Sequence, residues 1–206
     1  MGVILAVTTP PATLWIVQVG FRRGWGQAGV VAAAIGAGHA FLAVGTAFCF
    51  LLVVGFWRYI GLPARALALL ILGYMAWRCF WAEGAKSLRL PLEVSVPASR
   101  AQLFQQTFYI LVTMPMRIPV IVAYIIATAL LYRFGGFGNL PELGVGTGLG
   151  TLAWGAFIAL LGGWVGDRVE DSIILKSLNK LNRFAAVIFA ALMVITVYPL
   201  LLAGAR

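Results

Sequence analysis

The tetrapeptide Val7-Thr8-Thr9-Pro10 near the start of the chain has the same pattern, V-T-x-P, as Val112-Thr113-Met114-Pro115. The two motifs lie 105 residues apart in a chain of 206, so they fall at matching points of its two halves. Proline lacks a backbone N–H and clashes with the carbonyl four residues before it, so it interrupts a helix. The repeated motif therefore predicts one broken helix near the start of each half.

Both motifs lie in a chain that is unusually apolar. Apolar residues make up 62% of it, charged residues only 10%, and the mean hydropathy is +0.99. A soluble domain carries about 25% charged residues, which it needs to cover its core with a polar shell. The composition indicates an integral membrane protein. It excludes a soluble globular domain, a disordered chain and a disulfide scaffold.

Apolar runs divide the chain into six segments. A helix that spans a bilayer needs about 20 apolar residues, so six spans use most of the chain and leave no room for a soluble catalytic domain. We expect an all-α integral membrane protein, one transmembrane domain over residues 1–206, with six transmembrane helices. The segments cover approximately residues 3–20, 30–56, 63–81, 104–132, 144–165 and 184–203.

Each half of the chain, about 1–100 and 101–206, opens on a broken segment and holds three spans. Because three is odd, the two halves cross the membrane in opposite senses. This inverted-repeat plan recurs in transporters, whose sites form at the midplane where matching helices are broken. The alternative for the prolines is a kink without further function. On the transporter interpretation, the candidate substrate-binding residues at the breaks are Thr9, Pro10, Pro11, Thr113 and Pro115.

Loop charges predict an orientation. The loops at 21–29, 82–103 and 166–183, with Arg78 just before the second, hold ten of the fifteen basic residues. These alternate loops share one side, which the positive-inside rule makes cytoplasmic. Both termini are then expected outside, in a bacterial-type plasma membrane. We expect the scattered basic residues to serve this orientation and not to bind nucleic acid.

Arg117 is the sharpest single candidate, because it lies inside an apolar run and no apolar segment contains an acid. An arginine near the bilayer centre costs about 2.5–3.5 kcal/mol on insertion scales. One interpretation is that its guanidinium binds a carboxylate of a substrate through paired hydrogen bonds. The other is that it snorkels to the interface or bonds backbone carbonyls.

His39 is the only histidine of the chain and lies within the second segment. Histidine is the side chain that titrates most readily near neutral pH, so His39 is the candidate for proton coupling. A structural histidine with satisfied hydrogen bonds is the alternative, and the sequence does not decide between them.

Several stretches resemble LysE-type amino-acid exporters. Thr9-Pro10-Pro11-Ala12-Thr13-Leu14 and the basic, glycine-containing loop 21–29 are similar to the family's opening motif T-P-G-P-D/N and the loop that follows it. Residues 71–78 resemble its third helix, residues 104–115 the segment that ends in N-P-K, and residues 178–192 the closing loop and last helix.

The resemblance implies a six-helix exporter of amino acids or similar small metabolites, driven by an ion gradient. Carried over by residue, its first motif falls on Pro10 and Pro11, with Ala12 where the family has Asp or Asn. In the second motif the proline is Pro115, and Met114 and Met116 stand at its Asn and Lys. Arg117, one residue later, is a substitute for that Lys. The chain is therefore expected to be a divergent member.

The expected function is proton-coupled efflux of amino acids or similar carboxylate-bearing metabolites. The alternative is a non-transport scaffold or regulator that acts through helix–helix contacts. The overlapping GxxxG spacings of residues 144–150 would serve such contacts and are compatible with a homodimer. No acid–base or nucleophile set lies in the spans, so we expect no enzyme. No metal site or cofactor is expected either, and the partners are the small solute and the lipid bilayer.

Overall fold

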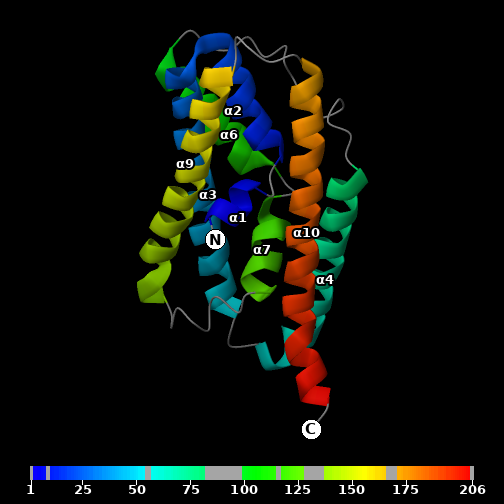
Figure 1. Ribbon diagram of the computed structural model, residues 1–206. Helices are drawn as coiled ribbons and strands as arrows, with labels where there is room; N and C mark the ends of the chain where they lie inside the picture. Colours follow the sequence, from blue (N-terminus) through cyan, green and yellow to red (C-terminus); the bar gives the residue numbers. More distant parts are fainter. Residues whose placement is uncertain are drawn as a thin grey trace.

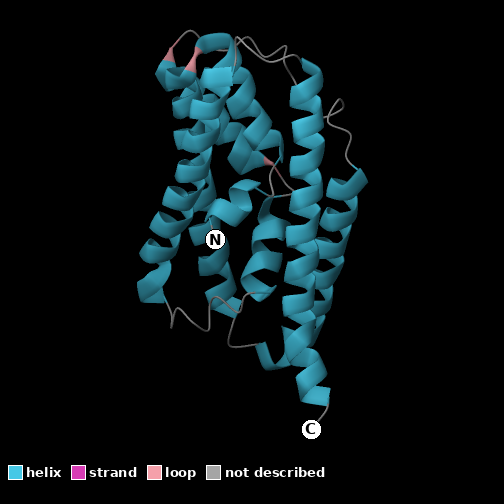
Figure 2. Ribbon diagram, viewed as in Figure 1, coloured by secondary structure: helices cyan, strands magenta, loops and turns pink. Residues whose placement is uncertain are grey.

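The structure, a computed structural model, describes residues 2–7, 10–53, 57–81, 99–114, 117–127, 137–165 and 171–204. Within these ranges all regular secondary structure is helical (Figure 2). In chain order the elements are α1 (Gly2–Val7), α2 (Pro10–Arg23), α3 (Trp25–Val53), α4 (Trp57–Trp81), α6 (Arg100–Thr113), α7 (Arg117–Ala127), the 3-10 turn η2 (Phe137–Asn139), α9 (Leu140–Val165) and α10 (Asp171–Gly204).

Each of the six apolar segments falls on one helix or on two consecutive short helices. Three stretches are long and apolar enough to cross a membrane, and they are Trp25–Leu52, Leu62–Trp81 and Phe137–Leu161. A fourth is present if α6 and α7, bent by 64° at their junction, form one span. The predicted all-helical membrane architecture is therefore confirmed in the described residues at the level of three or four candidate spans.

The long helices pair across the two halves of the chain. α3 packs along α9 in the antiparallel sense, and α4 packs in the same way along α10 (Figure 1). α2 and α6 both lie against α3, whereas α7 lies between α3 and α4. The junction of α2 and α3, the start of α6, the end of α9 and the start of α10 lie at the top of Figure 1, and α4 runs toward the same end. The helix ends therefore alternate between two sides, as the segment order predicts.

The break between α6 and α7 follows from the second motif. The hydroxyl of Thr113 donates to the carbonyl oxygen of Tyr109 at 2.8 Å. Met114 then adopts extended backbone, with φ −69° and ψ 109°, as a residue before a proline prefers; that proline is Pro115. The backbone N–H of Arg117 donates to the carbonyl oxygen of Met114 at 3.1 Å, and α7 begins there.

The first half has its break at the matching motif. α1 ends at Val7 and α2 begins at Pro10. A proline at the first position of a helix loses no hydrogen bond, because that N–H has no partner within the helix. The hydroxyl of Thr13 donates across the break to the carbonyl oxygen of Ala6 at 3.4 Å. In each half, therefore, one helix ends within the motif and another begins at or just after its proline.

Glycine allows α3 and α9 to cross backbone against backbone. A Cβ added to Gly36 would lie 3.0 Å from the carbonyl oxygen of Gly148. A Cβ added to Gly148 would lie 3.4 Å from the carbonyl oxygen of Gly36. The contact is reciprocal, and the two glycines are 112 residues apart.

The next glycines on each helix extend the same relation. Gly38 lies against Leu111 of α6, and Gly150, again 112 residues later, lies against the backbone of Gly2 and Val3 in α1. α1 and α6 are the first parts of the two broken segments. α6 therefore packs on Gly38 of α3, and α1 packs on Gly150 of α9.

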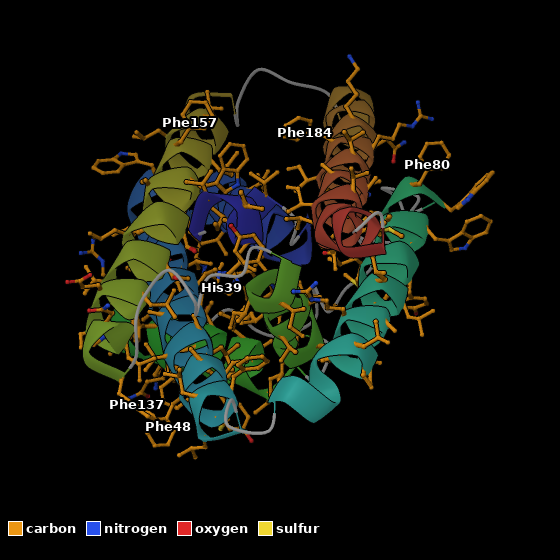
Figure 3. The ribbon with its side chains drawn as sticks, turned by 90° about the horizontal axis from the view of Figure 1, so that it is seen from below. His39, Phe48, Phe80, Phe137, Phe157 and Phe184 are labelled. Carbon is orange, nitrogen blue, oxygen red and sulfur yellow. The ribbon has the colours of Figure 1, made fainter. Side chains whose placement is uncertain are left out.

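Large apolar side chains cover the outside of the helices. Phe80, Phe157 and Phe184 are each more than half exposed. They lie at the periphery of the bundle, whereas His39 lies among the helices (Figure 3). Such a surface is unfavourable in water and favourable in a bilayer, so the described helices are compatible with a membrane protein.

We expect Gly36→Ala to lower the thermal unfolding midpoint of the protein in detergent. The added methyl group meets the backbone of α9, and overpacking of this kind costs about 1–3 kcal/mol. Gly45→Ala is the matched control on the same helix, because nothing lies within 4 Å of its added Cβ. It should leave the midpoint unchanged or raise it, since alanine has the higher helix propensity. Equal effects of the two substitutions would contradict the close crossing.

Candidate functional site

Three polar side chains from three helices meet in the core. Arg117 at the start of α7, His39 of α3 and Thr151 of α9 are 7%, 1% and 1% exposed. Nη1 of Arg117 lies 3.2 Å from Nε2 of His39. Nδ1 of His39 lies 3.3 Å from Oγ1 of Thr151. The structure therefore joins two candidate residues that the sequence presented separately, and adds a third.

The chemistry of the donors fixes the direction of every bond in this chain. A guanidinium has only donors, so Nε2 of His39 accepts from Arg117. The imidazole is then the neutral tautomer with its hydrogen on Nδ1, which donates to Oγ1 of Thr151. The hydroxyl of Thr151 donates in turn to the carbonyl oxygen of Gly2 at 3.1 Å. The hydrogen bonds thus run in one direction, from α7 through α3 and α9 to α1.

We call the hydrogen-bonded residues Arg117, His39 and Thr151 the polar chain. It lies where one apolar cluster of the core ends and another begins. We name them the α2–α6 cluster (Ala12, Ile16, Val19, Ala28, Val31, Ala32, Ile35, Leu103, Leu111 and Ala159) and the α4–α10 cluster (Leu5, Leu42, Ala47, Ala68, Leu72, Cys79, Val120, Ile121, Ala123, Tyr124, Ile125, Leu143, Ala185, Ala186, Phe189 and Leu192).

α3, α9 and the consecutive helices α6 and α7 pass from one cluster to the other near their polar residue. On α3, His39 lies between Ile35 of the α2–α6 cluster and Leu42 of the α4–α10 cluster. Arg117 lies in the same way between Leu111 and Val120. The polar groups therefore have an apolar cluster on either side of them along the helices, and both helix breaks fall at this level.

The electrostatic environment of Arg117 is positive. Arg117 occupies the first turn of α7, where the helix dipole is also positive and where a cation is unfavourable. The acids nearest to it in sequence are Glu93 and Glu142, and Glu142 is exposed at the start of α9. In the described part of the chain, the polar group placed against the guanidinium is the neutral imidazole of His39. This arrangement favours an anion.

One buried hydroxyl near the site has no partner. Oγ1 of Thr147 makes no hydrogen bond, although the residue is almost fully buried. Thr147 precedes Thr151 by four residues on α9, so the two lie on the same face of that helix. A buried polar group without a partner is uncommon in native structures and is typical of sites that hold a ligand or water.

The other candidate residues lie apart from this chain of bonds or outside the described residues. Thr113 is exposed, and its hydroxyl bonds carbonyls of its own helix. Pro10 and Pro11 form the start of α2, and their side chains are not described. Thr9 and Pro115 lie outside the described residues. Their assignment to substrate binding stays a prediction.

Thr151 and Thr147 are the site residues that the sequence interpretation missed. A signal for Thr151 is present in the sequence, because Gly148-Leu149-Gly150-Thr151 has the same glycine spacing as Gly36-Ala37-Gly38-His39. His39 and Thr151 therefore follow the same glycine spacing, and they bond each other. Thr147 carries no comparable signal.

Comparisons with protein-family models, curated proteins and solved structures found no match. The described residues contain no group of three or more His, Cys, Asp or Glu side chains that could hold a metal ion. The chemistry of the site therefore has to be inferred from its own residues.

We expect His39 and Arg117 to stabilise the fold together. A double-mutant cycle with His39→Ala and Arg117→Ala should give a coupling energy of about 1.5–3 kcal/mol, the range for a hydrogen bond to a charged group. Denaturant unfolding in detergent measures it. Arg100→Ala is the control partner, because Arg100 is exposed at the start of α6. It should be additive with His39→Ala to within about 0.5 kcal/mol. Additivity of the buried pair would contradict the geometry.

Proposed function

We propose that the chain is a secondary active exporter of amino acids or similar small, carboxylate-bearing metabolites, coupled to protons. The observation that carries the proposal is the buried guanidinium of Arg117. It lies at the start of a half-helix, with a neutral imidazole against it in place of a carboxylate. A guanidinium and a helix N-terminus both bind carboxylates well. The substrate's carboxylate would supply the negative charge that the site lacks.

The position of the site supports transport. Transporters with broken helices place the substrate near the bilayer midplane, at the helix ends that the breaks create. Here α2 and α7 both begin at mid-height in the molecule (Figure 1). The apolar clusters on either side of the polar chain would act as two barriers. Separation of one cluster at a time would open the site to one side of the membrane.

The paired helices support the inverted repeat. On this proposal there are six spans, and the second and third of each half pair with their counterparts, α3 with α9 and α4 with α10. The axis passes through the crossing of Gly36 and Gly148 and between His39 and Thr151. Membership of the LysE-type exporters, a bacterial-type plasma membrane and outside termini remain parts of this proposal, supported by the sequence resemblance and the loop charges.

The scaffold alternative is less well supported. It relies on the GxxxG spacings of residues 144–150 as a surface for a partner, including a second copy of the chain. Gly144 and Gly148 instead face Val44 and Gly36 of α3 within the same chain. Among these glycines Gly146 stays open, and one open glycine is a small surface for helix association.

Arg117→Ala should lower export of amino acids from proteoliposomes by about 10- to 100-fold, because it removes charged hydrogen bonds to the carboxylate. Arg117→Lys should recover only part of the rate, since an ammonium cannot form the paired bonds. Arg100→Ala on the same broken segment is the control and should export normally. Normal export by Arg117→Ala protein that is correctly folded would reject the proposed role.

The orientation can be tested with single cysteines in a background without Cys49 and Cys79. Ala101 and Glu142 are exposed near the starts of α6 and α9, at opposite ends of the molecule (Figure 1). In intact cells, a maleimide that does not cross membranes should label Glu142→Cys and leave Ala101→Cys unlabelled. The reverse pattern would overturn the positive-inside assignment.

A further inference from the structure

The bond between Arg117 and His39 has a consequence for how cargo and proton share the site, given the proposed export of a carboxylate-bearing solute. Nη1 of Arg117 is a donor and Nε2 of His39 an acceptor, 3.2 Å apart. A carboxylate that takes the Nη1–H group now directed at Nε2 replaces His39 as the partner of that group. The lone pair of Nε2 is then buried without a hydrogen bond, which incurs its full desolvation cost.

Two species can satisfy the freed Nε2. One is a proton, and the other is an N–H group of the cargo. If a proton takes it, proton and carboxylate bind together, and an inward proton gradient drives uptake. If an amine of the cargo takes it, the proton and the cargo compete for one atom, and the same gradient drives export.

We propose that Nε2 of His39 is used in turn by Arg117 in the empty site, by the amine of the bound cargo and by the coupling proton. Proton and cargo then exclude one another, which is the requirement for antiport. The cargo carries a carboxylate for Arg117 and an amine close to it for His39. The role of each atom follows from the donor and acceptor inventory of the pair.

Thr151 is the positioning residue in this arrangement. Its Oγ1 holds the hydrogen of the imidazole on Nδ1, at 3.3 Å, while its own hydrogen is donated to the carbonyl oxygen of Gly2. The lone pair of His39 is thereby kept on Nε2, facing Arg117. Without Thr151 the imidazole is free to adopt the other tautomer, which presents a hydrogen to the guanidinium and no acceptor to the cargo.

Of the residues that the structure describes, Arg117 is the charged group that lies against His39. Among the described residues, α7 brings Arg117 to it and carries Tyr124 two turns further on. α1 has no ionisable side chain. The described charged residues of α2, α6 and α9 are Arg23, Arg100 and Glu142, exposed at the far ends of those helices. The pH dependence of binding at this site is therefore expected to follow His39.

Protection against thermal unfolding of the purified full chain in detergent provides the test. The probes are an equimolar mixture of the twenty common L-amino acids and a matched mixture of the same acids without their α-amino groups. We expect the amino acids to protect, with an apparent affinity that falls about tenfold for each pH unit below the midpoint of the His39 titration. The acids without amines should protect weakly at high pH.

Variants separate the two roles. His39→Gln keeps an acceptor near the position of Nε2 but takes up no proton, so it should bind the amino acids with no pH dependence. Thr151→Val should lower the affinity and shift the midpoint, and Thr151→Ser should restore both. Thr196→Val is the matched control, because the buried hydroxyl of Thr196 bonds the carbonyl oxygen of Leu192 in its own helix.

The outcomes of the protection experiment either support or overturn the proposal. Amino-acid protection that strengthens with pH in the wild type and is flat in His39→Gln supports the proposal. Acids without amines that bind as well as amino acids, and better at low pH, overturn it but leave carboxylate recognition by Arg117 intact. No protection by either mixture overturns the proposal and the exporter function together. An unshifted midpoint in Thr151→Val removes Thr151 from the mechanism.

Discussion

A cation buried beside a neutral imidazole is the constraint on which the centre of this structure depends. Arg117 is buried inside the bundle, at the first position of α7. Its guanidinium needs an acceptor, and His39 supplies one only as a neutral ring with its hydrogen on the other nitrogen. That requirement fixes the role of Thr151 and, through it, the position of α1.

The two apolar clusters lie on either side of this polar chain. A buried hydrogen-bonded network is strong because the surrounding dielectric is low, and an unpaired member is costly for the same reason. The two clusters exclude water from both directions along the helices, so every polar atom of the network depends on its neighbour. The hydroxyl of Thr147 is buried one turn from Thr151 and makes no hydrogen bond with the described residues.

The elements of the fold could be predicted from the sequence because their causes are local. Apolar runs of sufficient length predict the helices, and the V-T-x-P motifs predict both breaks. The site was predictable only as separate residues, because the contact between His39 and Arg117 depends on how α3 and α7 pack. The position of Thr113 beside a break suggested a substrate contact. In the structure its hydroxyl donates instead to the carbonyl oxygen of Tyr109 in its own helix. Thr151 required recognition that the glycines before it repeat those before His39.

The crossing of Gly36 and Gly148 has a mechanical consequence. At the crossing itself the two backbones meet through glycine, so few side-chain atoms have to move when the helix angle changes, and the crossing can serve as a fulcrum. Displacement in a lever is smallest near its fulcrum and grows toward its ends. His39 and Thr151 lie three residues from the crossing, so their mutual bond would persist while the distant helix ends swing apart. The glycine crossing would then keep His39 and Thr151 aligned while it lets the ends of α3 and α9 move.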